Sequence, residues 1–143
     1  MSIEDNIQTV VDTFQKGRSI SEQNLGLDEL IATLNKFEPR YRSVAFEGAS
    51  MGVALSNQIS TWKEYGQLAD KHATQVHIGL GWAVAEKEID LASTLSEINP
   101  ELRIKVLDGF GYWYGLFRRR LTIRTQQIPE NITAELQAGF DQG

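Results

Sequence analysis

The chain has 143 residues, of which 41% are hydrophobic and 23% charged, the composition of an ordinary folded domain. Its formal net charge of −5 disfavours a general attraction to nucleic acid. The absence of cysteine excludes disulfides, thiolate catalysis, zinc fingers and iron–sulfur clusters. No apolar run approaches the roughly 20 residues that span a bilayer, and the N-terminus MSIEDNIQ has acids where a signal peptide has bases. We therefore expect a cytoplasmic protein.

Apolar residues at steps of three and four predict helices from the N-terminus onward. The first helix covers residues 3 to 16 and stops at Gly17. The second covers residues 27 to 37. A third begins with Pro39, which suits the first position of a helix, and its apolar stripe reaches Ile59.

The second half of the chain continues the helical pattern. Residues 61–64 have the spacing of a capping box, which opens a helix, and residues 74–87 form another. A short helix near 89–98 precedes a long aromatic helix over 99–119, and Pro129 starts a last one. No segment alternates with a period of two, so we predict an all-α fold.

An internal repeat appears when the chain is shifted by 61 residues. LIATLNKFEPRYRSVAFEG (30–48) then aligns with LASTLSEINPELRIKVLDG (91–109) at six identical positions of nineteen. Chance would give about one identity, so the match predicts repeated units.

Two tandem units of about 61 residues are therefore expected in a single all-helical domain over residues 1–143. The units cover about 27–60 and 88–120 and pack as a helical bundle or a short solenoid. FDQG at 140–143 echoes FQKG at 14–17, and is interpreted either as the start of a further unit or as a chance match.

Glu47 and Asp108 occupy equivalent positions of the repeat, each between an apolar residue and a glycine. Their apolar neighbours predict partial burial, and a buried carboxylate needs a partner or a raised pKa. The pair is a candidate general acid/base or cation site. The alternative is that each caps a helix or pairs with a tyrosine, Arg42 or Arg103.

Glycines recur inside the predicted helices, as in GASMG (48–52), GLG (79–81) and GYWYG (111–115). A glycine inside a helix costs about 1 kcal/mol relative to alanine, so a gain elsewhere must offset it. Close packing of helices within the chain, room for a ligand, and a seam between two copies are the three interpretations.

His72 and His77 are the only histidines, and their spacing of five places them on different sides of a helix. A metal-binding pair would be four residues apart, so we expect no metal site. His77 lies beside glycines and is a candidate ligand contact, with a structural role as the alternative.

Aromatic residues crowd the helix that follows Pro100 and cover nearly every side of it. Such a helix is either core or the wall of an apolar cavity. The candidate wall residues are Trp82, Tyr112, Trp113 and Tyr114. Arg118 begins a run of arginines that is solvated at the helix C-terminus, binds a phosphate or carboxylate group, or contacts a partner protein.

AFEGASMGVAL (45–55), HIGLGWAVAE (77–86) and LDGFGYWYGLF (107–117) resemble, in this order, the bacterial family of unknown function encoded beside enediyne polyketide synthase genes. Members of that family are about twice as long, so the resemblance implies an N-terminal half that pairs with a second copy or with a second-half domain. They often carry His and Glu where this chain has Trp113 and Tyr114. The resemblance implies an accessory role in specialised-metabolite biosynthesis and no particular reaction.

Three functional hypotheses remain. The first is an accessory protein of enediyne or polyene polyketide-like biosynthesis that binds an apolar small molecule, with Glu47, Asp108 and His77 as polar contacts. The second is an enzyme that acts on a polyene or isoprenoid-like chain, with Glu47 or Asp108 as general acid. The third is a structural module that forms a homodimer. None of the three requires a cofactor, a nucleic acid or a membrane span.

Overall fold

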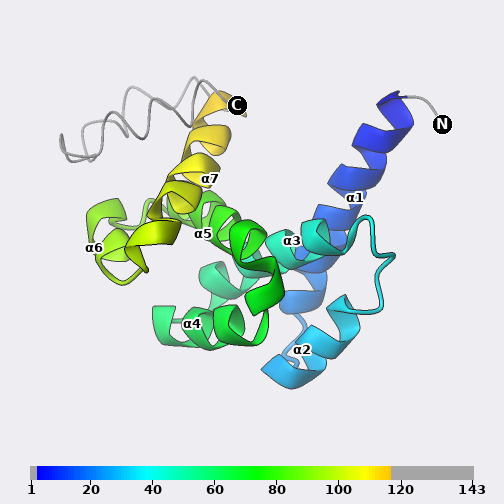
Figure 1. Cartoon of the computed structure of the whole chain (residues 1–143), viewed down its shortest axis with the longest axis horizontal. Helices are drawn as coiled ribbons and strands as arrows, with labels where there is room; N and C mark the ends of the chain where they lie inside the picture. The colour runs from blue at the N-terminus through cyan, green and yellow to red at the C-terminus, as the bar shows by residue number, and fades with distance from the viewer. Residues whose placement is uncertain (1–2, 117–143) are drawn as a thin grey trace. The chain divides into compact units, whose positions relative to one another are not determined.

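The computed structural model describes residues 3–116 and, within them, the side chains of residues 6–115. This part of the chain consists of α-helices α1 to α7 and two short 3₁₀ helices, and contains no strand (Figure 1). The predicted all-α fold is confirmed. None of the described helices is long and apolar enough to cross a bilayer.

The contacts divide the chain into two compact units, Met1–Val76 and His77–Gly143. The boundary falls inside a helix, α5 (Ala73–Lys87), and not in a linker. Each unit is described separately below.

Unit 1 is formed by four helices and a short turn. They are α1 (Ile3–Ser21), α2 (Leu27–Leu34), α3 (Arg42–Ser56), α4 (Ile59–Leu68) and the 3₁₀ turn η1 (Asp70–His72). The helices bury apolar side chains that include Leu30, Leu34, Phe46, Val53, Trp62 and Tyr65. Loss of water contact by these side chains is the main stabilising contribution to the unit.

Unit 2 contains most of α5, followed by three further elements. They are α6 (Leu91–Ser96), the 3₁₀ turn η2 (Pro100–Leu102) and α7 (Arg103–Leu116). Its buried apolar side chains include Leu80, Val84, Leu95, Val106, Phe110 and Trp113. The Asp90 carboxylate accepts hydrogen bonds from two backbone N–H groups at the start of α6, so it caps this short helix.

Several predicted helix boundaries are wrong. Helix α1 continues through Gly17 to Ser21, and α3 begins at Arg42 because Pro39 lies in the preceding turn. Likewise α4 begins at Ile59, before the predicted capping box. The predicted helix after Pro129 lies outside the described residues. Helix ends are poorly predicted from local sequence when a residue such as glycine serves a contact between helices.

The glycine at position 17 shows such a role. A Cβ atom there would overlap the carbonyl oxygen of Ala45 on α3. In return, a Cβ atom at Gly48 of α3 would overlap the carbonyl oxygen of Phe14 on α1. The two helices therefore approach backbone to backbone at a crossing that a larger residue would push apart.

Unit 2 contains the same kind of crossing between α5 and α7. A Cβ atom at Gly109 would overlap the carbonyl oxygen of Ile78, and one at Gly81 would overlap that of Val106. Gly109 and Gly48 are equivalent in the alignment of the repeat. In both units, therefore, a glycine at the equivalent position allows the backbones of two helices to approach closely.

A second contact is also common to both units. The Arg42 side chain donates to the carbonyl oxygen of Phe37 over 3.1 Å, and Arg103 donates to that of Ile98 over the same distance. Both arginines are the first residue of their helix and reach back to the preceding turn. The contact ties this turn to the helix in each unit.

Candidate functional site

Asp108 has unusual surroundings for a carboxylate. It lies on α7 and is 3% exposed, and Lys105 Nζ is 3.8 Å from its Oδ2 atom. Its Oδ1 atom is buried and has no hydrogen-bond partner in the described part of the chain. Burial raises the pKa of this carboxyl, and the charge of Lys105 offsets part of the rise. Most buried polar atoms are paired, so the free oxygen needs an explanation.

Helical spacing defines what lies beside Asp108 on α7. Gly111 and Tyr112 follow it by three and four residues, on the next turn of the same face. Gly111 has no side chain to cover the carboxyl, and Tyr112 is half-buried. A hydroxyl, carbonyl or amide of a ligand could pair with Oδ1, since a carboxyl both donates and accepts when protonated.

Trp113 and Tyr114 lie in the interior of unit 2. They are 2% and 1% exposed, and their ring centroids are 5.4 Å apart with the planes at 85°. Phe110 adds a second ring contact to Tyr114 at 4.7 Å. These contacts favour the core interpretation for the two residues. Among the predicted wall residues, Trp82 and Tyr112 are the half-buried ones.

The other predicted site residues are distributed over the two units. Glu47 lies on α3 in unit 1, whereas His77 lies on α5 in unit 2, and both are half-buried. Arg118 is outside the described residues. The proposed pairing of Glu47 with Asp108 stays a prediction, because the two belong to different units. In residues 3–116 no three metal-binding side chains gather.

The glycines favour one of the three interpretations offered by the sequence. At Gly17, Gly48, Gly81 and Gly109 the backbone of the same unit fills the space that a side chain would need, and at Gly52 Ser21 does so. Close packing of helices within the chain therefore explains these five glycines. Their surroundings do not support a ligand slot or a seam between copies at these positions.

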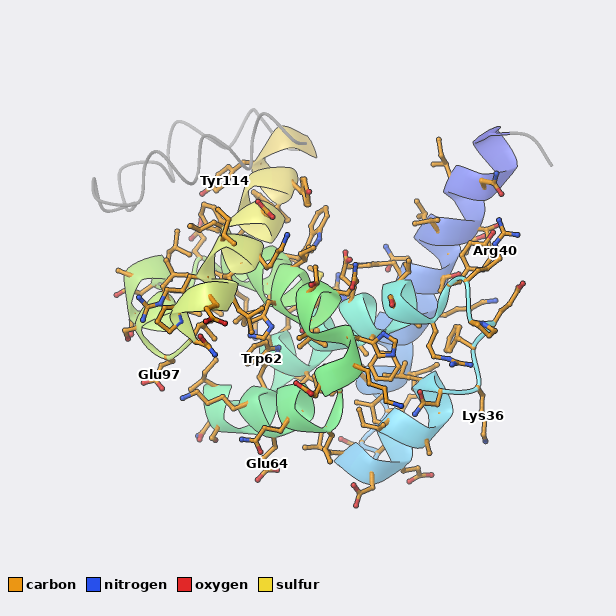
Figure 2. All side chains as sticks on the ribbon, in the orientation of Figure 1. Lys36, Arg40, Trp62, Glu64, Glu97 and Tyr114 are labelled. Carbon is orange, nitrogen blue, oxygen red and sulfur yellow. The ribbon has the colours of Figure 1, made fainter. Side chains whose placement is uncertain are left out.

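A buried polar network in unit 1 has no signal in the sequence. The hydroxyl of Ser50 on α3 donates to the carbonyl of Val76 and accepts from the indole N–H of Trp62 over 2.8 Å. Trp62 is labelled in Figure 2. The Tyr65 hydroxyl donates to the carbonyl of Phe46 over 2.7 Å, and burial raises its pKa. The two partners of each of these hydrogen bonds lie 12 to 26 residues apart in the sequence, farther than neighbours on one face of a helix.

A second group in unit 1 contains His72. The Ser43 hydroxyl lies 2.8 Å from Nδ1 of His72, and the imidazole stacks on Phe46 with ring centroids 4.2 Å apart. Burial, followed by the charges of Arg42 and Lys71, lowers the pKa of His72. The serine lies 29 residues before the histidine, so only the fold brings them together.

Comparison with known proteins finds one family. The family model described as "Protein of unknown function (DUF1702)" matches residues 1–143. No curated protein and no solved structure matches the chain. The match includes both units and all of the predicted site residues.

Proposed function

The chain belongs to the DUF1702 family of proteins of unknown function, and we propose that it binds an apolar small molecule as an accessory protein of specialised-metabolite biosynthesis. Asp108 supplies the polar contact in this proposal. The observation that carries it is the buried Oδ1 atom without a partner among the described residues. Tyr112 and Trp82, which are half-buried, are the proposed apolar contacts in the same unit.

The energetic argument rests on the cost of the free oxygen. A buried polar atom without a partner costs about 1–3 kcal/mol. Lys105 contacts the other oxygen, Oδ2, and does so at 3.8 Å, beyond hydrogen-bond distance. A ligand that pairs with Oδ1 recovers this cost on binding, which gives Asp108 a use that a purely structural carboxylate lacks.

The biosynthetic context comes from the resemblance noted above. The segments at 45–55, 77–86 and 107–117 resemble those of the family encoded beside enediyne polyketide synthase genes. A polyene intermediate is a long apolar chain with few oxygen atoms. One buried carboxyl among half-buried aromatic residues suits such a molecule.

A catalytic role is the second candidate, and the raised pKa of Asp108 favours it. A general acid must hold its proton at the working pH, and burial shifts the pKa of a carboxyl in that direction. In this alternative Asp108 donates a proton to a polyene or isoprenoid-like chain.

Native mass spectrometry of protein purified gently from its host tests the proposal. We expect a discrete extra mass on the wild-type protein that is lost or strongly reduced in Asp108→Asn. Asp12→Asn is the control, because it removes an exposed carboxylate from α1. Wild-type protein without an added mass, or an Asp108→Asn variant that retains it, contradicts binding through Asp108. Retention of a different, unconverted molecule by Asp108→Asn supports the catalytic alternative.

A further inference from the structure

His72 in unit 1 is held in a fixed orientation. Ser43 at the start of α3 occupies Nδ1 over 2.8 Å, and Phe46 supports the ring face at an interplanar angle of 18°. The hydrogen bonding described for His72 involves Nδ1 alone. With the Ser43 hydroxyl as donor to Nδ1, the Nε2 atom carries the proton and can donate to a group from outside the chain.

Besides burial, the positive charges of Arg42 and Lys71 lower the pKa of the His72 imidazole. Arg42 precedes Ser43 and Lys71 precedes His72, and both positive charges disfavour protonation of the ring. Arg42 is half-buried, and one of its nitrogens donates to the carbonyl of Phe37. Its Nε atom is buried without a partner in the described part of the chain. A half-buried guanidinium held by a neutral carbonyl has no charge compensation from that contact.

Charged groups of both signs lie on the elements around this contact. The acids are Glu47 on α3, Asp70 on η1 and Glu38 in the segment before α3. The same segment adds Lys36 and Arg40, which are exposed (Figure 2). With Arg42 and Lys71, these stretches hold four basic and three acidic residues; α4 adds Lys63 and Glu64, and α2, which packs against α3 and α4, adds Asp28 and Glu29.

Unit 2 repeats the arginine contact with different residues beside it. Arg103 is equivalent to Arg42 and also donates to a carbonyl of the preceding turn, through its Nε atom where Arg42 uses a terminal nitrogen. The residues equivalent to Ser43 and Phe46 are Ile104 and Leu107, which cannot hold a histidine by a hydrogen bond. The arginine–carbonyl contact therefore belongs to the architecture of both units, and the histidine–serine contact is an addition in unit 1.

We propose that His72, Arg42 and Lys71 form a binding site for the anionic group of a small molecule, a phosphate or a carboxylate, which accepts a hydrogen bond from Nε2 of His72. The anion compensates the charges of Arg42 and Lys71. Compensation favours the imidazolium form, so binding is coupled to uptake of a proton by His72. The site lies in unit 1 and does not depend on the role proposed for Asp108.

Proton NMR of the full chain tests this site directly, because His72 and His77 are the only histidines and His77 is an internal reference. The C2–H signals are followed through a pH titration in chloride, inorganic phosphate or acetate at one ionic strength. We expect a saturable shift of the His72 signal and a higher pKa of His72 in phosphate, in acetate, or in both. The responding anion identifies the preferred group.

Two variants separate the site from a general salt effect. Lys71→Gln changes an exposed residue and is expected to weaken anion binding about two- to fivefold, as loss of one exposed charge contact does. Arg103→Gln removes the equivalent contact of unit 2 and is expected to leave anion binding unchanged. Equal shifts of His72 and His77, no saturable effect beyond chloride, or unchanged affinity in Lys71→Gln would overturn the proposal.

Discussion

The indole N–H of Trp62 donates a 2.8 Å hydrogen bond to the hydroxyl of Ser50, which itself donates to the carbonyl of Val76. Ser50 is completely buried and Trp62 is 2% exposed. The serine therefore connects α3 to α4 and to the first turn of α5, because its hydroxyl both donates and accepts a hydrogen bond.

Ser50→Ala is expected to lower the free energy of unfolding by about 1–3 kcal/mol, because it removes the hydroxyl that accepts a hydrogen bond from the buried indole N–H of Trp62. Urea denaturation followed by circular dichroism measures the change. Ser19→Ala, on the exposed side of α1, is the control and should be nearly neutral. Combining Ser50→Ala with Trp62→Phe should cost less than the sum of the two. Additive losses would show that the hydrogen bond contributes little.

Two glycine substitutions should have opposite effects. Gly48→Ala places a Cβ atom against the carbonyl of Phe14 and should destabilise unit 1 by about 1–3 kcal/mol. Gly66→Ala inside α4 meets Val76 at 3.9 Å, an ordinary contact, and should stabilise by about 0.5–1 kcal/mol through helix propensity. Thermal unfolding of both variants measures the two changes in stability. A Gly48→Ala variant as stable as the wild type would contradict the close crossing of α1 and α3.

Asp108→Asn should change how stability depends on pH. The folded-state pKa of Asp108 is raised above its unfolded value, so its contribution favours the folded state below the unfolded pKa and is lost as pH rises through the folded one. The wild type should therefore lose stability relative to Asp108→Asn as pH rises from about 4 toward neutrality. Urea midpoints at several pH values measure the difference. A relative gain by the wild type over this range would mean that pairing with Lys105 outweighs burial.

Glu88→Gly should stabilise the end of α5. Glu88 has a φ angle of 56°, in the left-handed region, and the next N–H, that of Ile89, bonds back to the carbonyl of Val84. Glycine adopts this conformation without a Cβ clash, which is worth about 1 kcal/mol. Asn24→Gly is the matched comparison at a φ of 57° and should gain less, because asparagine tolerates this region. A loss of thermal stability in Glu88→Gly would show that the glutamate side chain matters more than its backbone.

Much of the helical organisation could be predicted from residue spacing. The apolar steps over residues 74–87 predict a helix that matches α5 closely, and those from residue 27 locate the start of α2. The boundaries failed where a residue has a long-range partner. Gly17 has the sequence properties of a helix end, yet it lies inside α1. Its lack of a side chain leaves room for the carbonyl oxygen of Ala45.

The candidate site was predicted less completely. The position of Asp108 between an apolar residue and a glycine suggests burial, and the structure places it in the interior with a raised pKa. The contact of Ser43 with His72 was not predicted, because partners 29 residues apart leave no periodic signal. For Trp113 and Tyr114, spacing alone leaves core and cavity wall open, since both bury an aromatic ring.

The sequence by itself determined the helical class, the candidate carboxylates and the glycine-rich helices of this protein. These properties follow from local energetics, because the period of apolar residues and the cost of glycine act within one helix. Only the tertiary structure decided that Gly48 serves a backbone crossing, that Asp108 keeps one oxygen unpaired among residues 3–116 and that His72 stacks on Phe46. Each of these depends on atoms that approach from a distant part of the chain, and their packing is a property of the folded unit as a whole.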